Sequence, residues 1–251
     1  MVDHVRRAEA EGVVVGVSGG LDSAVVAALA AEAFGPERVT AVLMPSDDSD
    51  PQDEAHGRLL CDALGIQPLL RPIQPALEAL PLPDPATRGN AKARLRMTIL
   101  YAEAQASRRL VVGTGNKSEM LVGYFTKHGD GGNDMQPIGD LYKMQVRKLA
   151  ASLPVPRPII DKPPSAGLRP GQTDEDDLGM PYERLDQVLK GIEMNASPDA
   201  IAQRTGLDVA EVRRVAGMVR ASEHKRHAPL IPKIGARTVG IDWRRSVHWD
   251  A

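Results

Sequence analysis

The stretch VVVGVSGGLDSAVVAAL, residues 13–29, joins a short β-branched run to an alanine-rich segment through two adjacent glycines. The run VVVGV has the composition of a buried strand, whereas Val25, Leu29 and Ala33 recur at helical spacing on one face. The stretch therefore predicts a strand, a tight turn and a helix. Such a turn presents backbone N–H groups at the positive end of the helix dipole, which favours binding of an anion.

The turn at residues 16–23 differs from the common phosphate loop, because GxxxxGK[ST] requires a lysine and this stretch has none. The alternative is a simple tight turn in which Ser18 or Asp22 caps the helix. We favour anion binding, since SGG-x-DS is far more restrictive than a glycine pair. SGGLDS resembles the pyrophosphatase loop of the N-type ATP pyrophosphatases, which holds the pyrophosphate that leaves when ATP donates AMP. That resemblance implies that Asp22 holds magnesium.

The composition limits the classes of protein to be considered. With 251 residues and 42% apolar residues, the chain is long enough for one compact domain with a substantial core. A net charge of −2 disfavours nucleic-acid binding by bulk electrostatics. No apolar stretch has transmembrane length and residues 1–12 lack a signal-peptide core, so we expect a cytoplasmic protein without membrane contact. The single cysteine, Cys61, excludes an internal disulfide, and we expect it in the core.

Strands and helices are expected to alternate through the first half of the chain. Residues 87–107 are expected to form a long helix, whose apolar stripe is Leu95, Ile99, Ala102 and Ala106. The other expected elements are strands at residues 39–45 and at residues 66–73, where prolines break up the strand, and a helix at residues 52–64. The stretch RRLVVGTGNKSE, residues 108–119, is expected to repeat the order of strand, turn and helix. This order predicts an α/β fold with an open, Rossmann-like parallel sheet and helices on both faces, as in adenine nucleotide α-hydrolases. Ligands of such sheets bind beyond the carboxyl ends of the strands, where the first loop and residues 114–119 would meet.

The second half of the chain is expected to be a proline-rich loop followed by helices. Prolines are dense from residue 154 to 170 and the acidic run TDEDD follows, so residues 163–176 are predicted to form a mobile lid. Residues 181–228 are predicted to be helical, within one domain that comprises residues 1–251. Residues 197–215 resemble a helix-turn-helix, but acidic residues offset the arginines there, so we favour scaffolding over DNA binding.

Several polar residues allow two interpretations from the sequence alone. Glu119 is either a second magnesium ligand or the partner of Asn116 in a capping box, and the spacing alone favours the box. Lys127 precedes a glycine-rich acidic loop, and Arg94 lies on a basic helix face that is typical of solvated helices. The cations of residues 224–227 either stabilise a helix C-terminus or bind phosphate.

Six motifs, taken together and in their order along the chain, resemble those of the NAD synthetase family. The members of this family amidate deamido-NAD. The resemblance covers residues 13–229 and is most specific at TKHGDGGND and EHKR. The motifs are SGGLDS, GNAKARLRM, VVGTGNKSEMLVGYFTKHGDGGND, PIGDLYKMQVRKLA, KPPSAGLRPGQTDEDDLG and SEHKR. Within the family, the phrasing is most similar to the archaeal and thermophile-type members.

The resemblance implies roles for particular residues. Asp22 and Glu119 would bind Mg²⁺, and Lys143 would be catalytic by stabilising charge on the phosphates. The residues implied to bind ATP are Gly16, Val17, Ser18, Gly19, Gly20, Leu21, Asp22, Ser23, Thr114, Lys143 and Ser165. Those implied to bind deamido-NAD are Arg94, Lys127, Asp134, His224 and Lys225.

Two positions depart from the family pattern. Ser165 stands where many members have threonine and keeps the hydroxyl. Leu43 stands where many members have arginine, so a phosphate contact is lost there or is supplied by another residue.

The family resemblance also implies the reaction and the assembly. The nicotinate carboxylate attacks the ATP α-phosphate to give an adenylate and pyrophosphate, and ammonia then displaces AMP. We expect free ammonia as the donor, no intrinsic glutaminase, and a homodimer with sites near the interface. A base that deprotonates ammonium is not identified, although Asp174 and Asp177 are candidates. The alternatives are another N-type ATP pyrophosphatase, of the GMP synthetase or tRNA-thiolation type, and a non-catalytic nucleotide-binding module.

Overall fold

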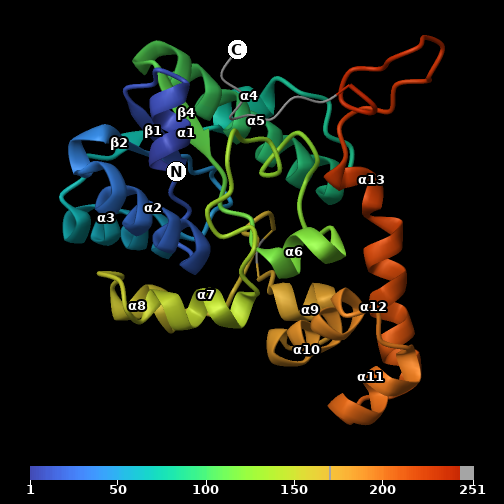
Figure 1. The fold of residues 1–251 in the computed structure, drawn as a ribbon. Helices are drawn as coiled ribbons and strands as arrows, with labels where there is room; N and C mark the ends of the chain where they lie inside the picture. The colour runs from blue at the N-terminus through green and yellow to red at the C-terminus, as the bar shows by residue number, and fades with distance from the viewer. Residues whose placement is uncertain (170, 244–251) are drawn as a thin grey trace.

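A parallel sheet of four strands, with helices around it, organises the first half of the chain in a computed structural model that describes residues 1–169 and 171–243 (Figure 1). The strands are β1 (Gly12–Gly16), β2 (Val39–Leu43), β3 (Leu69–Leu70) and β4 (Arg109–Val112), in the order β3-β2-β1-β4. In the register of the sheet, Val14 pairs with Thr40 on β2 and with Val111 on β4. The prediction of an open α/β sheet is thus confirmed.

Helices cover both faces of the sheet, which is why β1 is apolar on both sides. Val13 and Val15 lie in the core against α2 (Leu21–Phe34), whereas Val14 lies in a second core cluster against α5 (Pro85–Ser107). The first face also carries α3 (Pro51–Leu64), and α4 (Gln74–Glu78) packs beside α5 on the second face. An outer pair, α7 (Lys143–Ala150) and α8 (Arg157–Ile160), lies over α2 (Figure 1).

A third core cluster lies among the helices of the second half of the chain. Tyr182, Leu189, Ile201 and Val215 are buried there. The helices α11 (Pro198–Thr205) and α12 (Val209–Ala221) are joined by a turn at Gly206, and both pack against α10 (Tyr182–Glu193). The pair that resembled a helix-turn-helix is therefore part of this core. The remaining elements are α1 (Val2–Arg7), η1 (Pro36–Arg38), α6 (Lys117–Val122), α9 (Asp174–Leu178) and α13 (Glu223–Arg226).

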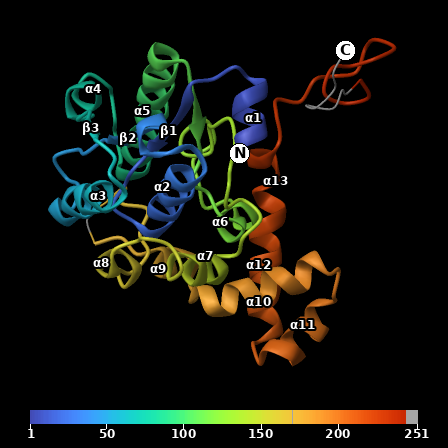
Figure 2. The same cartoon turned by 60° about the vertical axis from the view of Figure 1, so that its left-hand side comes forward.

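Residues 228–243 extend away from the packed helices in both views (Figures 1 and 2). Throughout residues 1–169 and 171–243, the helices are too short or too polar to cross a bilayer. Residue 170, inside the expected lid, and residues 244–251 lie outside the described part of the chain.

Two expectations about strands and helices need correction. The strand expected at residues 66–73 is reduced to Leu69–Leu70, because Pro68 and Pro72 on either side have no N–H to donate to the sheet. On α5, Ala102 is exposed, and so is Ala106.

The buried residues of α5 are instead Gly89, Lys92, Ala93 and Ala104, while Leu95 and Ile99 of the expected stripe are partly buried against the core, as is Leu100. On α2 the burial is also wider than one face, because α7 covers the side that faces away from the sheet. Cys61 is 1% exposed on α3, as expected of a core residue.

Candidate active site

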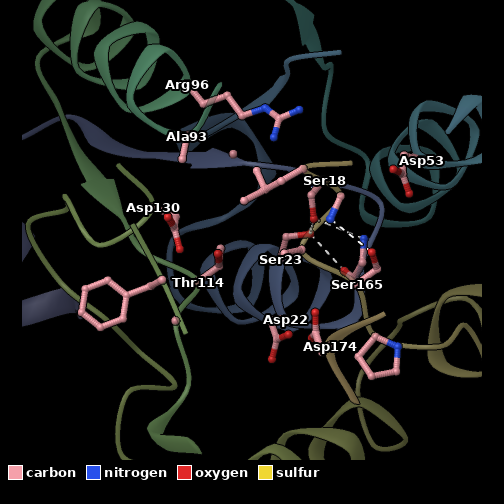
Figure 3. Close-up of a pocket in the computed structure, with 18 of the residues that line it drawn as sticks. Ser18, Asp22, Ser23, Asp53, Ala93, Arg96, Thr114, Asp130, Ser165 and Asp174 are labelled. Atoms are coloured by element: carbon pink, nitrogen blue, oxygen red, sulfur yellow. Dashed lines mark hydrogen bonds between the residues drawn. The ribbon is translucent and has the colours of Figure 1, made fainter. Parts of the chain in front are cut away.

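A cleft of about 1000 Å³ opens at the carboxyl ends of β1, β2 and β4. Its walls come from the loop after β1, from residues 43–54 after β2, from residues 111–115 after β4, and from residues 162–169 and 171–174. Figure 3 shows the side chains of Ser18, Thr114 and Ser165 approaching this space from different elements. Segments far apart in sequence therefore meet where ligands of parallel α/β sheets bind.

The loop after β1 is held in one shape by short-range contacts. Gly19 has φ +78°, and a Cβ there would lie 2.2 Å from the Asp53 carbonyl oxygen, so a larger residue does not fit. The Ser23 hydroxyl donates to the Gly20 carbonyl at 3.0 Å and lies 3.1 Å from the Ser18 hydroxyl. The cap residue of α2 is Gly20, so neither Ser18 nor Asp22 caps this helix.

Lys143 brings together the two carboxylates that the sequence assigned to a metal. Its ammonium donates to Oδ2 of Asp22 and lies 3.1 Å from Oε1 of Glu119. The Lys143 side chain is 7% exposed, so this ion triplet lies largely out of water. Asp22 lies in the first turn of α2, Glu119 in the first turn of α6, and Lys143 begins α7, so three helix starts converge at one end of the cleft.

Burial and charge set the ionisation of this triplet. Burial lowers the pKa of Lys143, but the neighbouring carboxylates, led by Asp22, outweigh this effect and raise it. Burial raises the pKa of Glu119 against the opposing effect of Lys143. The two carboxylates therefore favour the charged form of Lys143 at this end of the cleft.

Asn116 contacts both Glu119 and Asp22. The Asn116 side chain accepts from the Glu119 N–H at 3.0 Å, and Glu119 Oε2 accepts from the Asn116 N–H at 3.4 Å, which completes a capping box. Asn116 Nδ2 also donates to Asp22 Oδ1 at 3.2 Å. The capping box is thus confirmed, and it uses only one carboxylate oxygen of Glu119, while the other oxygen faces Lys143.

Asp174 is a fourth charged residue at this end, and the acidic run TDEDD conceals its burial. It is 3% exposed and lies beside Asp22 (Figure 3), and burial raises its pKa. Tyr182 donates its hydroxyl to Oδ2 at 3.1 Å. Oδ1 has no hydrogen-bond partner among the described residues.

Residues 162–168 lie along the cleft and are tied to both faces of the sheet. Lys162 forms an ion pair with Asp53 on α3. On α5, the fully buried Lys92 donates to Asp48 Oδ1 at 2.6 Å and to the Leu168 carbonyl at 3.0 Å. Basic residues such as those of GNAKARLRM usually lie on a solvated helix face, so the burial of Lys92 is not predicted from the sequence.

The other predicted site residues divide into two sets. Thr114, Ser165 and Lys225 line the cleft, as do Gly16, Val17, Gly20 and Leu21. Gly19 supports the loop without lining the cleft. The predicted residues that lie elsewhere are Arg94, Lys127, Asp134 and His224.

Two of the residues that lie outside the cleft, Asp134 and Lys127, make hydrogen bonds within the chain instead. Arg94 and His224 are exposed, and Asp134 accepts hydrogen bonds from Tyr101 at 3.1 Å and from the Val111 N–H at 2.8 Å. Lys127 donates to the His224 carbonyl at 2.7 Å. One chain thus gathers the predicted ATP residues but leaves most of the predicted deamido-NAD residues outside the cleft.

The residue that departs from the family pattern at β2 is fixed in the core. Leu43 is 2% exposed, and its side chain lies 2.4 Å from where a Cβ on Gly57 would be, so an arginine would not fit without rearrangement. Close by, Arg96 lines the cleft from α5 (Figure 3) and donates Nε to the Met44 carbonyl at 3.2 Å.

Comparison with known proteins identifies the family. The family model described as NAD synthase matches residues 1–229. The chain belongs to the NAD synthase family. A relative from Methanosarcina mazei, named NH(3)-dependent NAD(+) synthetase, is 44% identical over 240 residues, covering 92% of this chain and 94% of that protein. A relative of the same name from Hyperthermus butylicus is 46% identical over 236 residues, covering 91% and 86%.

Solved structures agree with this assignment. The NMN synthetase from Francisella tularensis has a TM-score of 0.81 at 40% identity, with 92% of each chain covered. The NH3-dependent NAD synthetase from Campylobacter jejuni, solved with the nitrate ion, has a TM-score of 0.78 at 32% identity and covers 92% of this chain and 93% of that one.

Proposed function

We propose that this chain is an ammonia-dependent NAD synthetase, which amidates deamido-NAD to NAD and converts ATP to AMP and pyrophosphate. The observation that carries the proposal is the Lys143 ammonium between Asp22 and Glu119, placed beside an anion-binding loop in a member of the NAD synthase family. A reaction that builds and expels pyrophosphate needs cationic groups at this position.

The chemistry divides between activation and amidation. The nicotinate carboxylate attacks the ATP α-phosphate, so that its oxygen forms the new P–O bond as pyrophosphate leaves. The loop N–H groups and Lys143 stabilise the charge on the departing phosphates. Ammonia then attacks the acyl carbon, AMP leaves, and the nitrogen loses a proton to give the amide. No step needs an enzyme nucleophile, and burial raises the pKa of Cys61 to about 11.

Asp22 and Glu119 suit a magnesium ion. Both carboxylates contact one ammonium, so their oxygens already converge on a single cation position. Among the described residues, no cluster of three or more histidine, cysteine or acidic residues is arranged to hold a metal. Two carboxylates completed by substrate phosphates and water are a common Mg²⁺ environment. When bound, Mg²⁺ would neutralise phosphate charge and orient the triphosphate.

Arg96 is our choice for the phosphate contact that Leu43 does not make. It brings a guanidinium to the cleft wall beside Met44, the residue that follows Leu43. A guanidinium binds phosphate oxygens as a planar pair of donors.

We further propose a cytoplasmic homodimer that binds neither nucleic acid nor membranes. The exposed positions of Arg94 and His224 support a dinucleotide site that a second subunit completes.

The test is a complete product balance with purified protein. ATP, Mg²⁺, ammonium and deamido-NAD should give NAD, AMP and pyrophosphate in equal amounts, with no pyrophosphate when deamido-NAD is left out. Because the Francisella tularensis neighbour is an NMN synthetase, nicotinate mononucleotide is the comparison substrate. Faster amidation of the mononucleotide would replace deamido-NAD in the proposal. Pyrophosphate formation with xanthosine monophosphate or tRNA, but with neither nicotinate substrate, would favour another ATP pyrophosphatase.

A further inference from the structure

The ammonium of Lys143 occupies the position that the two carboxylates would offer a divalent cation. It bonds to Oδ2 of Asp22 and lies 3.1 Å from Oε1 of Glu119. Two cations cannot share this position, because like charges a few ångströms apart in a buried site repel strongly. Binding of a divalent cation therefore requires the Lys143 side chain to move.

The backbone at Lys143 is fixed, so only the side chain is able to move. The Lys143 N–H donates to the Ser118 hydroxyl at 2.9 Å, and Ser118 donates in turn to Asp186 at 2.5 Å. The next N–H, of Met144, donates to the second oxygen of Asp186 at 2.9 Å. The start of α7 is thus clamped, and the ammonium moves on the flexible lysine stem.

A vacant acceptor lies within the same buried surroundings. The Lys143 ammonium lies 5.1 Å from the centre of the Tyr182 ring, and the Tyr182 hydroxyl donates to Oδ2 of Asp174. Oδ1 of Asp174 is buried and has no hydrogen-bond partner among the described residues. A buried carboxylate oxygen without a donor is costly, so it is a strong acceptor for a displaced ammonium.

We propose that Asp174 is a positioning residue for Lys143: a divalent cation binding to Asp22 and Glu119 displaces the Lys143 ammonium, which moves to Oδ1 of Asp174. Asp22 and Glu119 would then hold the cation, and Asp174 would compensate the charge of the displaced ammonium. Lys143 therefore weakens metal binding before nucleotide arrives, and Asp174 lessens that effect. The inference rests on the proposed cation site but not on turnover.

Binding of Mn²⁺ without nucleotide tests the exchange, since Mn²⁺ takes the oxygen ligands that Mg²⁺ takes. Free Mn²⁺ is measured by electron paramagnetic resonance with wild-type protein and with Lys143→Met. We expect Lys143→Met to bind Mn²⁺ at least about tenfold more tightly, the scale of one lost charge-assisted contact. Lys162→Met is the matched control, because Lys162 also lines the cleft but pairs with Asp53. It should leave the affinity unchanged.

A double-mutant cycle separates a specific acceptor from a general field effect. Asp174→Asn should weaken Mn²⁺ binding in both backgrounds. The factor of weakening should be at least threefold larger in the wild-type background than in the Lys143→Met background, which corresponds to a coupling of about 0.6 kcal/mol. An equal effect in both backgrounds would mean that Asp174 acts only through its charge and would overturn the proposal. So would unchanged or weaker binding by Lys143→Met, or no Mn²⁺ binding by any variant.

If Lys143→Met does not fold, Lys143→Gln takes its place in both experiments. The binding pattern decides the exchange whatever the activity, whereas a wild-type protein that makes no NAD refutes the proposed function alone.

Discussion

Replacing Lys92 with methionine should uncouple the cleft wall from the sheet without unfolding the protein. Lys92 is 0% exposed and donates to Asp48 Oδ1 at 2.6 Å and to the Leu168 carbonyl at 3.0 Å. Leu168 also packs against Gly89, where an added Cβ would lie 3.2 Å from its own. Methionine keeps the length and apolar stem of the lysine but removes every donor.

The expected magnitudes differ for global stability and for the local segment. Asp48 remains 29% exposed, and the Ser46 hydroxyl still donates to it at 2.7 Å, so it does not become an isolated buried charge. Removal of one partner of a fully buried ion pair costs about 3–5 kcal/mol, and the exposure of Asp48 should keep the global cost below that range. Loss of the charged hydrogen bond to Leu168 should cost about 1.5–3 kcal/mol. Opening of residues 162–168 should therefore become about 10- to 100-fold more frequent.

Limited proteolysis measures the opening, and steady-state kinetics measure its effect. Cleavage in residues 162–168 should accelerate in proportion to the open population when closing is faster than cleavage. The KM for ATP should rise more than the KM for deamido-NAD, because this segment carries Ser165. Arg88→Met is the control, since Arg88 also reaches Asp48, at 3.5 Å, without bonding to Leu168. Equal cleavage of Lys92→Met and wild type, at equal thermal stability, would refute the reasoning.

Four further outcomes are expected. Asp22→Asn should lower kcat more than about a hundredfold in a folded protein, since it removes charge but preserves shape; near-normal activity at limiting Mg²⁺ would count against the cation site. Lys225→Ala, which loses bonds to two backbone carbonyls beside the cleft, should raise the KM for deamido-NAD and leave that for ATP nearly unchanged. Burial raises the pKa of Asp48, but hydrogen bonds led by the one from Lys92 lower it to about 2. The ionised Asp48 therefore stabilises the folded protein fully above the unfolded pKa of about 4, and this stabilisation is lost as the pH falls toward 2. Denaturation from about pH 5 to pH 2 should therefore show a smaller loss for Asp48→Asn than for wild type. Glutamine freed of ammonium should give no NAD, and glutamate formation that is abolished in Cys61→Ser would reveal a missed amidotransferase.

Local patterns in the sequence were sufficient to predict most of the fold. The helices expected at residues 52–64 and 87–107 begin at Pro51 and Pro85, because Asp50 and Asp84 cap them through their side chains. The third strand was overestimated, because the prolines that break it up leave only Leu69 and Leu70 paired with the sheet. Burial on α2 was underestimated, because periodicity within a helix gives no information on a second layer such as α7.

The residues that the sequence did not reveal are charged residues buried by tertiary contacts. Lys92 is flanked by other basic residues, and only the fold places Asp48 and Leu168 against it. Asp174 belongs to an acidic run, yet it shares one buried helix face with Leu178, four residues later. That i, i+4 spacing, after the cap at Thr173, was the available signal, but the run of charge concealed it.

The loop after β1 contains no lysine, so the cation at this end of the cleft comes from the second half of the chain. The cation arrives instead from Lys143, more than a hundred residues later, at the first position of α7. The direction of α7 at that point depends on Asp186 of α10, whose two oxygens accept from Ser118 and from the Met144 N–H. No described residue of α10 lines the cleft. The packing of α10 nevertheless sets the position from which the Lys143 ammonium reaches Asp22, so the anion loop and the helical core operate as one site.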